Sequence, residues 1–176
     1  MPRTARQVAL FALDQWETRR TFADEVLHEA LENSRLGSAD RAFVMEAFFG
    51  TLRRLSRLDF IISRLRDGTV VAQTQRVLRL GLYQLFHMRV ADHAAVHETV
   101  NLAGSRNRGL INAILRRAIR ERDRLEQSLE RAPRAIRLSH PEFLISRWEQ
   151  NFGRADAEAL CEWNNQPAEV YVRANG

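Results

Sequence analysis

The sequence predicts an all-α protein: a helical bundle followed by a short helical connector and the first strand of a truncated second domain. Apolar residues recur at the i, i+3, i+4 spacing of a buried helix face through most of the chain. Glycine and proline, at 8 and 4 of 176 residues, are too few for a low-complexity chain. With 45% apolar residues, the chain is long enough to close one core and carry an appendage.

Successive apolar rows predict the helices of the bundle. The rows cover 3–17, 22–31, 44–65, 77–86 and 96–103, and a further row begins at residue 110. Thr21, Ser38 and Asp92 are the expected N-caps of the second, third and fifth helices. The third row is long, so it is either one bent helix or two helices with a break near Asp59.

Two glycines lie inside these helical rows. A glycine in a helix interior costs about 1 kcal/mol relative to alanine. Gly50 and Gly81 therefore predict that another helix backbone passes close to each position.

The character of the sequence changes after residue 129. Residues 131–140 contain arginines and a proline without a helical row, which predicts a linker. Ser139 and Glu142 form an expected capping box before two connector helices. Residues 167–175 then alternate with a period of 2, which predicts the first strand of the truncated domain.

The charge of the chain is positive and carried by one residue type. All 27 basic residues are arginine, against 22 acidic residues, for a net charge of +5. The guanidinium group binds phosphate in a fork and stacks on bases, which favours nucleic acid as a partner. A GC-rich genome explains the same composition without any selection on function.

Other classes of protein are disfavoured. No apolar run approaches the roughly 20 residues of a membrane span, and the N-terminus lacks a secretory signal, so we expect a cytoplasmic protein with no membrane partner. Cys161, the only cysteine, has apolar neighbours that predict a buried hydrophobe and not a nucleophile. His93 and His97 lack the H-E-x-x-H order, and no phosphate-binding glycine loop is present. We therefore predict no catalytic, metal or cofactor site in this chain.

Arginines near the sixth helical row are the candidate RNA-binding residues. The candidates are Arg106, Arg108, Arg116, Arg117 and Arg120, and Arg3 and Arg6 at the exposed start of the first helix join them if the first and sixth helices pack together. Asn112 is expected to tie its helix to a neighbouring loop.

Three runs carry a family resemblance. In order, SADRAFVMEAFFGTLRRLSRLD, RLGLYQLFHMRVADHAAVHETVNLA and RGLINAILRRAIRE resemble the NusB/RsmB family of all-helical RNA-binding domains over roughly residues 1–130. Arg116 and Arg117, and the tail SHPEFLISRWEQNFG with ALCEWNN and VYVRAN, are similar to the RsmB-type ribosomal RNA cytosine-C5 methyltransferases. The resemblance implies an RNA-binding domain over 1–130, a linker over 131–140, and connector helices and the start of the methyltransferase side over 141–176.

Three functions remain open. The resemblance favours the N-terminal recognition domain of a ribosomal RNA methyltransferase, which would bind ribosomal RNA. Catalysis and S-adenosylmethionine would belong to a further domain. The alternatives are a NusB-like transcription antitermination factor, with a small ribosomal protein as partner, and a helical protein-interaction module without an RNA role.

Overall fold

The all-α prediction is confirmed by the computed structural model, which describes residues 4–19 and 21–168. Arg3 and most of the predicted strand at 167–175 lie outside the described residues. The helices of the bundle are α1 (Ala5–Arg19), α2 (Ala23–Glu32), α3 (Ser38–Arg53), α4 (Leu55–Leu65), α5 (Ala72–His87), α6 (Asp92–Leu102), the 3-10 turn η1 (Ser105–Asn107), α7 (Arg108–Arg120) and α8 (Arg122–Glu130). They are followed by α9 (Arg134–Arg137), α10 (Glu142–Phe152) and α11 (Arg154–Asn164).

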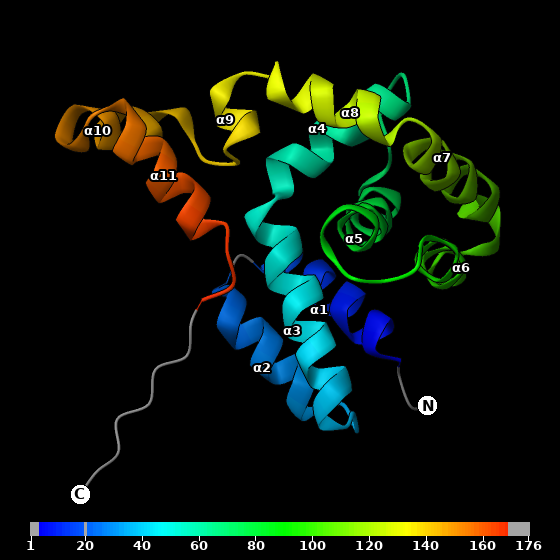
Figure 1. The fold of residues 1–176 in the computed structure, drawn as a ribbon. Coiled ribbons are helices and arrows are strands. Elements are labelled where there is room, and N and C mark those ends of the chain that lie inside the picture. The colour runs from blue at the N-terminus through cyan, green and yellow to red at the C-terminus, as the bar shows by residue number, and fades with distance from the viewer. Residues whose placement is uncertain (1–3, 20, 169–176) are drawn as a thin grey trace, which may run out of the picture.

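Helix α5 is the centre of the bundle, surrounded by α1, α3, α4, α6 and α7 (Figure 1). Two apolar clusters meet on it. Leu80 packs with the first cluster, formed mainly by α1, α2 and α3, whereas Leu78 and Leu82 pack with the second, formed by α4 to α8. All three leucines are fully buried. Helix α5 therefore buries most of its circumference, which is typical of a central helix.

Both interior glycines of the bundle are sites of close approach. A Cβ at Gly50 would lie 1.9 Å from Oη of Tyr83, and a Cβ at Gly81 would lie 2.7 Å from Cγ2 of Thr99. The neighbours are side chains of other helices and not the predicted helix backbones. The Tyr83 hydroxyl crosses over Gly50 and donates to Glu46. Burial and this hydrogen bond both raise the pKa of Tyr83.

The long third row forms two helices, and the break lies at Arg54, not near Asp59. Asp59 sits inside α4, where its carboxylate binds Arg79. The predicted side-chain caps are wrong as well. Helices α2, α3 and α6 begin after Phe22, Gly37 and Ala91, without a capping side-chain hydrogen bond.

The segment predicted as a linker at 131–140 contains the short helix α9. Arg134 binds Glu142 at 2.6 Å and Glu149 at 2.5 Å. The expected capping box is absent, because Ser139 has a φ of 55° and Glu142 is bound by Arg134 instead of capping α10. These ion pairs order the segment and fasten it to the connector helices.

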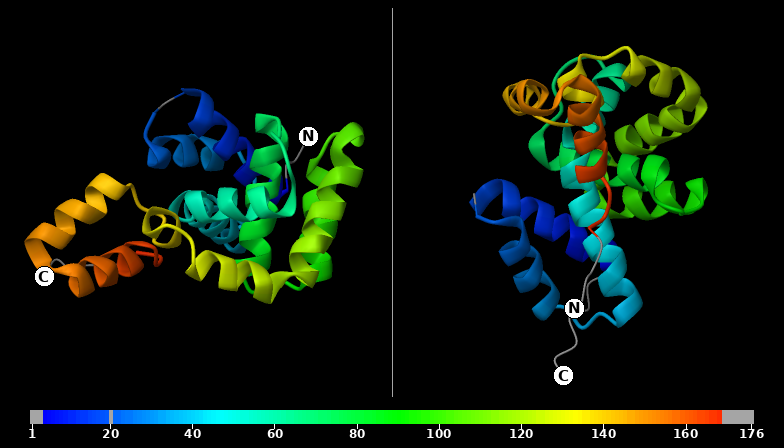
Figure 2. Two further views of the ribbon diagram at one scale, coloured as in Figure 1. Left: turned by 90° about the horizontal axis from the view of Figure 1, so that it is seen from above. Right: turned by 60° about the vertical axis from the view of Figure 1, so that its left-hand side comes forward.

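The connector has a small core of its own, formed by Leu138, Ile145 and Cys161. Cys161 is fully buried, as the sequence indicated, and burial raises the pKa of its thiol. Helices α10 and α11 pack on each other and stand beside the bundle, on the side opposite α6 and α7 (Figures 1 and 2). Within residues 4–19 and 21–168, no helix combines the length and apolarity needed to cross a membrane.

Candidate nucleic-acid interface

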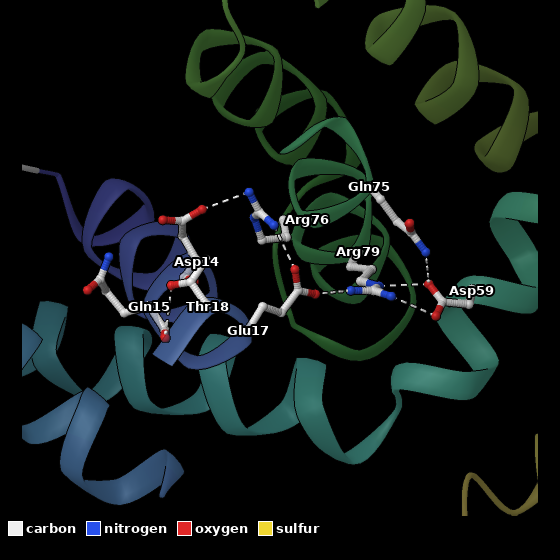
Figure 3. A network of polar contacts seen from close by, with 8 residues as sticks. All are labelled: Asp14, Gln15, Glu17, Thr18, Asp59, Gln75, Arg76 and Arg79. Atoms are coloured by element: carbon white, nitrogen blue, oxygen red, sulfur yellow. Dashed lines mark hydrogen bonds and ion pairs between the residues drawn. The ribbon is translucent and has the colours of Figure 1, made fainter. Parts of the chain in front are cut away.

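Two arginines of the bundle, Arg76 and Arg79, hold helices together through ion pairs. Arg76 and Arg79 of α5 lie between carboxylates of α1 and α4 (Figure 3). Arg76 binds Asp14 and Glu17, each at 2.7 Å. Arg79 binds Glu17 and grips Asp59 with two hydrogen bonds of 2.7 and 2.8 Å. Both guanidinium side chains are only 12% exposed, so this network has a structural role and is closed to a ligand.

Arg6 is another inward-facing arginine. Its Nε donates to Oε1 of the buried Gln84 at 2.7 Å, and its guanidinium carbon lies 4.8 Å from the centre of the Phe43 ring. Helix α1 packs mainly on α2, α3, α5 and α6, and α7 packs on α4, α5, α6 and α8. The expectation that Arg6 lies at an exposed helix start is therefore wrong, and Arg6 does not join the arginines of α7.

Four of the remaining candidates are exposed on η1 and α7. Arg106 lies in η1, Arg108 opens α7, and Arg116 and Arg120 follow on the outer face of α7; all four are exposed. Arg108 donates to the Ala103 carbonyl at 3.2 Å. Helix α7 contains no acidic residue, so its positive charge is not compensated from within the helix. We call Arg106, Arg108, Arg116 and Arg120 the α7 arginine surface.

Arg117 differs from its neighbour Arg116. It donates to the Leu65 carbonyl at 2.9 Å and to Glu121 at 2.7 Å, which ties α7 to the end of α4. The hydrogen bond from Arg117 holds the pKa of Glu121 below its usual value. Of the adjacent pair, Arg116 faces outward and Arg117 is half-buried, as consecutive positions on a helix require.

A groove of about 370 Å³ runs between α6 and α7, beside the α7 arginine surface. One wall carries His93, His97 and Asn101, which recur every four residues along α6. The other carries Asn112 and Arg116, one turn apart on α7. Nε of Arg116 donates to Oδ1 of Asn112 at 3.0 Å, so the expected tie from Asn112 to a neighbouring loop is wrong.

The less exposed part of the groove lining is apolar. Val96, Val100 and Ile119 line it, and Val96 is 5% exposed. The carboxylate at one end, Asp92, accepts a hydrogen bond of 2.8 Å from Arg122. In the part of the chain that the structure describes, no cluster of histidine, cysteine and acidic residues could hold a metal ion.

Sequence reasoning missed this groove because its walls belong to separate helices. Each wall does have a signal in the sequence, namely polar residues spaced four apart beside the apolar row of the same helix. Only the packing of α6 on α7 joins the two rows.

A second group of arginines lines a cleft of about 340 Å³ between the bundle and the connector. Arg54, Arg57 and Arg137 share this cleft with Glu130 and Glu162. Arg57 donates to the Arg137 carbonyl at 2.6 Å, which links α4 to α9. Because carboxylates accompany the arginines, this cleft is less positive than the surface of α7.

Comparison with known proteins agrees with this architecture. Residues 3–120, which hold α1 to α7, match the model of the NusB family. The chain belongs to the NusB family. The resemblance found in the sequence is thereby confirmed, and the α7 arginine surface lies within the NusB domain.

Residues 140–176 match a second family, described as the ferredoxin-like domain of RsmF/B-like methyltransferases. The predicted connector thus belongs with a domain other than the NusB domain. Residues 121–139 lie between the two matches and contain α8 and α9.

Curated relatives carry methyltransferase names. The chain is 32% identical to the probable ribosomal RNA small subunit methyltransferase B of Synechocystis sp. over 98% of this chain and 41% of the relative. It is 36% identical to ribosomal RNA small subunit methyltransferase B of Pseudomonas putida over 80% of this chain and 34% of the relative. The chain therefore spans about two-fifths or less of the length of these relatives.

Proposed function

We propose that this chain is the RNA-recognition region of a ribosomal RNA cytosine-C5 methyltransferase, and that it binds ribosomal RNA through the α7 arginine surface. The observation that carries the proposal is the α7 arginine surface itself, four exposed arginines on η1 and on a helix that contains no carboxylate. Arginine on an uncompensated surface attracts the RNA backbone and releases its counterions. The match of two successive domains and the names of the relatives support the choice of ribosomal RNA. The proposal places the protein in the cytoplasm, with ribosomes.

The proposal assigns binding and not chemistry to this chain. Methyl transfer of this class would draw its methyl group from S-adenosylmethionine. The proposal assigns no S-adenosylmethionine site to residues 1–176, which contain no glycine-rich loop of the G-x-G-x-x-G kind. These residues would hold the RNA in position on the face formed by η1 and α7.

The test is the salt dependence of RNA binding by the double variant Arg116→Gln, Arg120→Gln. We expect weaker binding to a structured fragment of small-subunit ribosomal RNA, and a slope of log affinity against log salt that is smaller by about 2. The control variant Arg35→Gln, Arg147→Gln removes the same charge from exposed sites on the α2–α3 turn and on α10. It should keep the slope of the unsubstituted chain.

Two results would contradict the proposal. Equal slopes for both double variants would remove the α7 arginine surface from the interface. No binding to structured ribosomal RNA even at low salt would favour a protein-interaction module instead.

A further inference from the structure

We propose that the groove between α6 and α7 binds unpaired nucleobases of the RNA whose phosphates contact the α7 arginine surface. This inference rests on the proposed function, because it takes RNA as the ligand. It adds a second kind of contact, in which bases enter a groove beside a helix that binds the backbone.

The size and floor of the groove suit flat, partly apolar rings. Its volume of about 370 Å³ falls within the range of roughly 300–1,000 Å³ typical of ligand sites. Val96, Val100 and Ile119 supply an apolar surface on which a ring can lie. Helix α6 lines the groove from Asp92 to Asn101, about 14 Å at 1.5 Å per residue, which is long enough for more than one base.

The rim of the groove offers the groups that recognise base edges. Asn101 and Asn112 each carry an amide that both donates and accepts hydrogen bonds, and His93 and His97 offer rings for stacking. Arg116 already occupies Oδ1 of Asn112. The amide nitrogen of Asn112 makes no hydrogen bond with any described residue, so it is available as a donor to a ligand.

The charge around the groove favours RNA over an apolar peptide. Arg116 forms part of one wall and belongs to the α7 arginine surface, whereas the carboxylate of Asp92 is bound by Arg122. Stacking surfaces beside positive charge are the usual combination in proteins that bind single-stranded nucleic acid. An apolar helix would offer no hydrogen-bond partner to the amide nitrogen of Asn112, which has none among the described residues.

The experiment compares three RNA probes of equal length: a single strand, the same strand with abasic positions, and a duplex in which every base is paired. We expect the variant His97→Ala, Asn112→Ala to bind the single strand about tenfold more weakly than the unsubstituted chain. Its affinity for the abasic strand and the duplex should be unchanged. Its salt slope should also be unchanged, because it removes no phosphate contact.

The control variant His28→Ala, Asn151→Ala removes the same residue types from exposed positions on α2 and α10 and should leave all three affinities unchanged. Thermal unfolding followed by circular dichroism checks that both variants are folded. His97 is 72% exposed at its side chain, so its removal should not lower the melting temperature.

The outcomes separate this inference from the proposed function. If the unsubstituted chain binds the abasic and the normal strands equally, RNA binding stands and the base-binding groove is refuted. The same conclusion follows if His97→Ala, Asn112→Ala weakens all three probes alike. If none of the three probes binds while the structured fragment of ribosomal RNA does, this inference fails and the proposed function stands.

Discussion

At the scale of single residues, Gly50 matters because the Tyr83 side chain occupies the space where a Cβ would lie. Tyr83 passes over this position to reach Glu46, and a methyl group on Gly50 would overlap the ring. The glycine therefore permits both the packing of α5 on α3 and the burial of the Tyr83 hydroxyl.

We expect Gly50→Ala to lower the free energy of unfolding by about 1–3 kcal/mol, the usual cost of overpacking a close-packed core. Chemical denaturation measures the change. Gly37→Ala is the matched control, because a Cβ there meets nothing within 4 Å and the φ of Gly37 is −70°. Equal stability of the two variants would show that Tyr83 moves aside without cost.

Residues also show where sequence reasoning reached its limit. Arg6 and Arg117 have the same side chain as Arg116, yet the first two bind Gln84 and the Leu65 carbonyl and only the third faces outward. The partners lie 78 and 52 residues away in the chain. No local pattern contains that information, so an arginine on a predicted helix cannot be assigned to a ligand or to a partner helix from its own segment.

At the scale of elements, the helical rows of the bundle were predictable because apolar spacing is a local property. The position of the break was predicted wrongly, near Asp59. Asp59 lies inside α4 because its carboxylate binds Arg79 of α5, and a contact between separate helices leaves no local pattern in the sequence. The short helix α9 was also missed. Its arginines form ion pairs with α10 and α11, which lie later in the chain.

The network in Figure 3 predicts how strongly α1 and α4 depend on α5. Arg79→Met would leave Glu17 and Asp59 without their shared partner, and we expect a loss of about 2 kcal/mol in the free energy of unfolding. Arg19→Met is the control. It breaks only an exposed pair with Glu29, which is worth less than about 1 kcal/mol.

Thermal or chemical unfolding of the two variants distinguishes these cases. A loss for Arg79→Met no larger than that for Arg19→Met would mean that the network contributes nothing beyond a surface ion pair.

At the scale of the whole molecule, the connector is fastened to the NusB domain through α9. The backbone carbonyl of Arg137 accepts a hydrogen bond from Arg57 of α4. The guanidinium of Arg137 binds Glu158 of α11 at 3.1 Å. One residue thus bridges the bundle and the connector helices.

The pair between Arg137 and Glu158 predicts a response to acid. The hydrogen bond from Arg137 lowers the pKa of Glu158 below its usual 4.5. The stabilisation is therefore complete above about pH 4.5, the ordinary value for an unfolded chain, and is lost as the pH falls through the lower folded value. The variant Glu158→Gln should lack this stabilisation at neutral pH, and the stability of its connector should change less as the pH falls.

Hydrogen exchange of α11 measures this effect. The expected result is a lower protection factor for α11 in Glu158→Gln at neutral pH, and a smaller further fall in that factor on acidification than in the unsubstituted chain. Asp156→Asn, an exposed change on the same helix, should behave like the unsubstituted chain. Equal exchange in both variants at neutral pH would show that the pair does not hold the connector.

The central position of α5 also affects how the chain folds while it is being synthesised. The cluster formed by α1, α2 and α3 is sealed by Leu80, which is fully buried. A nascent chain that ends before α5 has all three N-terminal helices but lacks the side chain that closes their core. Their core is therefore complete only once α5 has been made, and until then part of its apolar surface stays exposed to other chains.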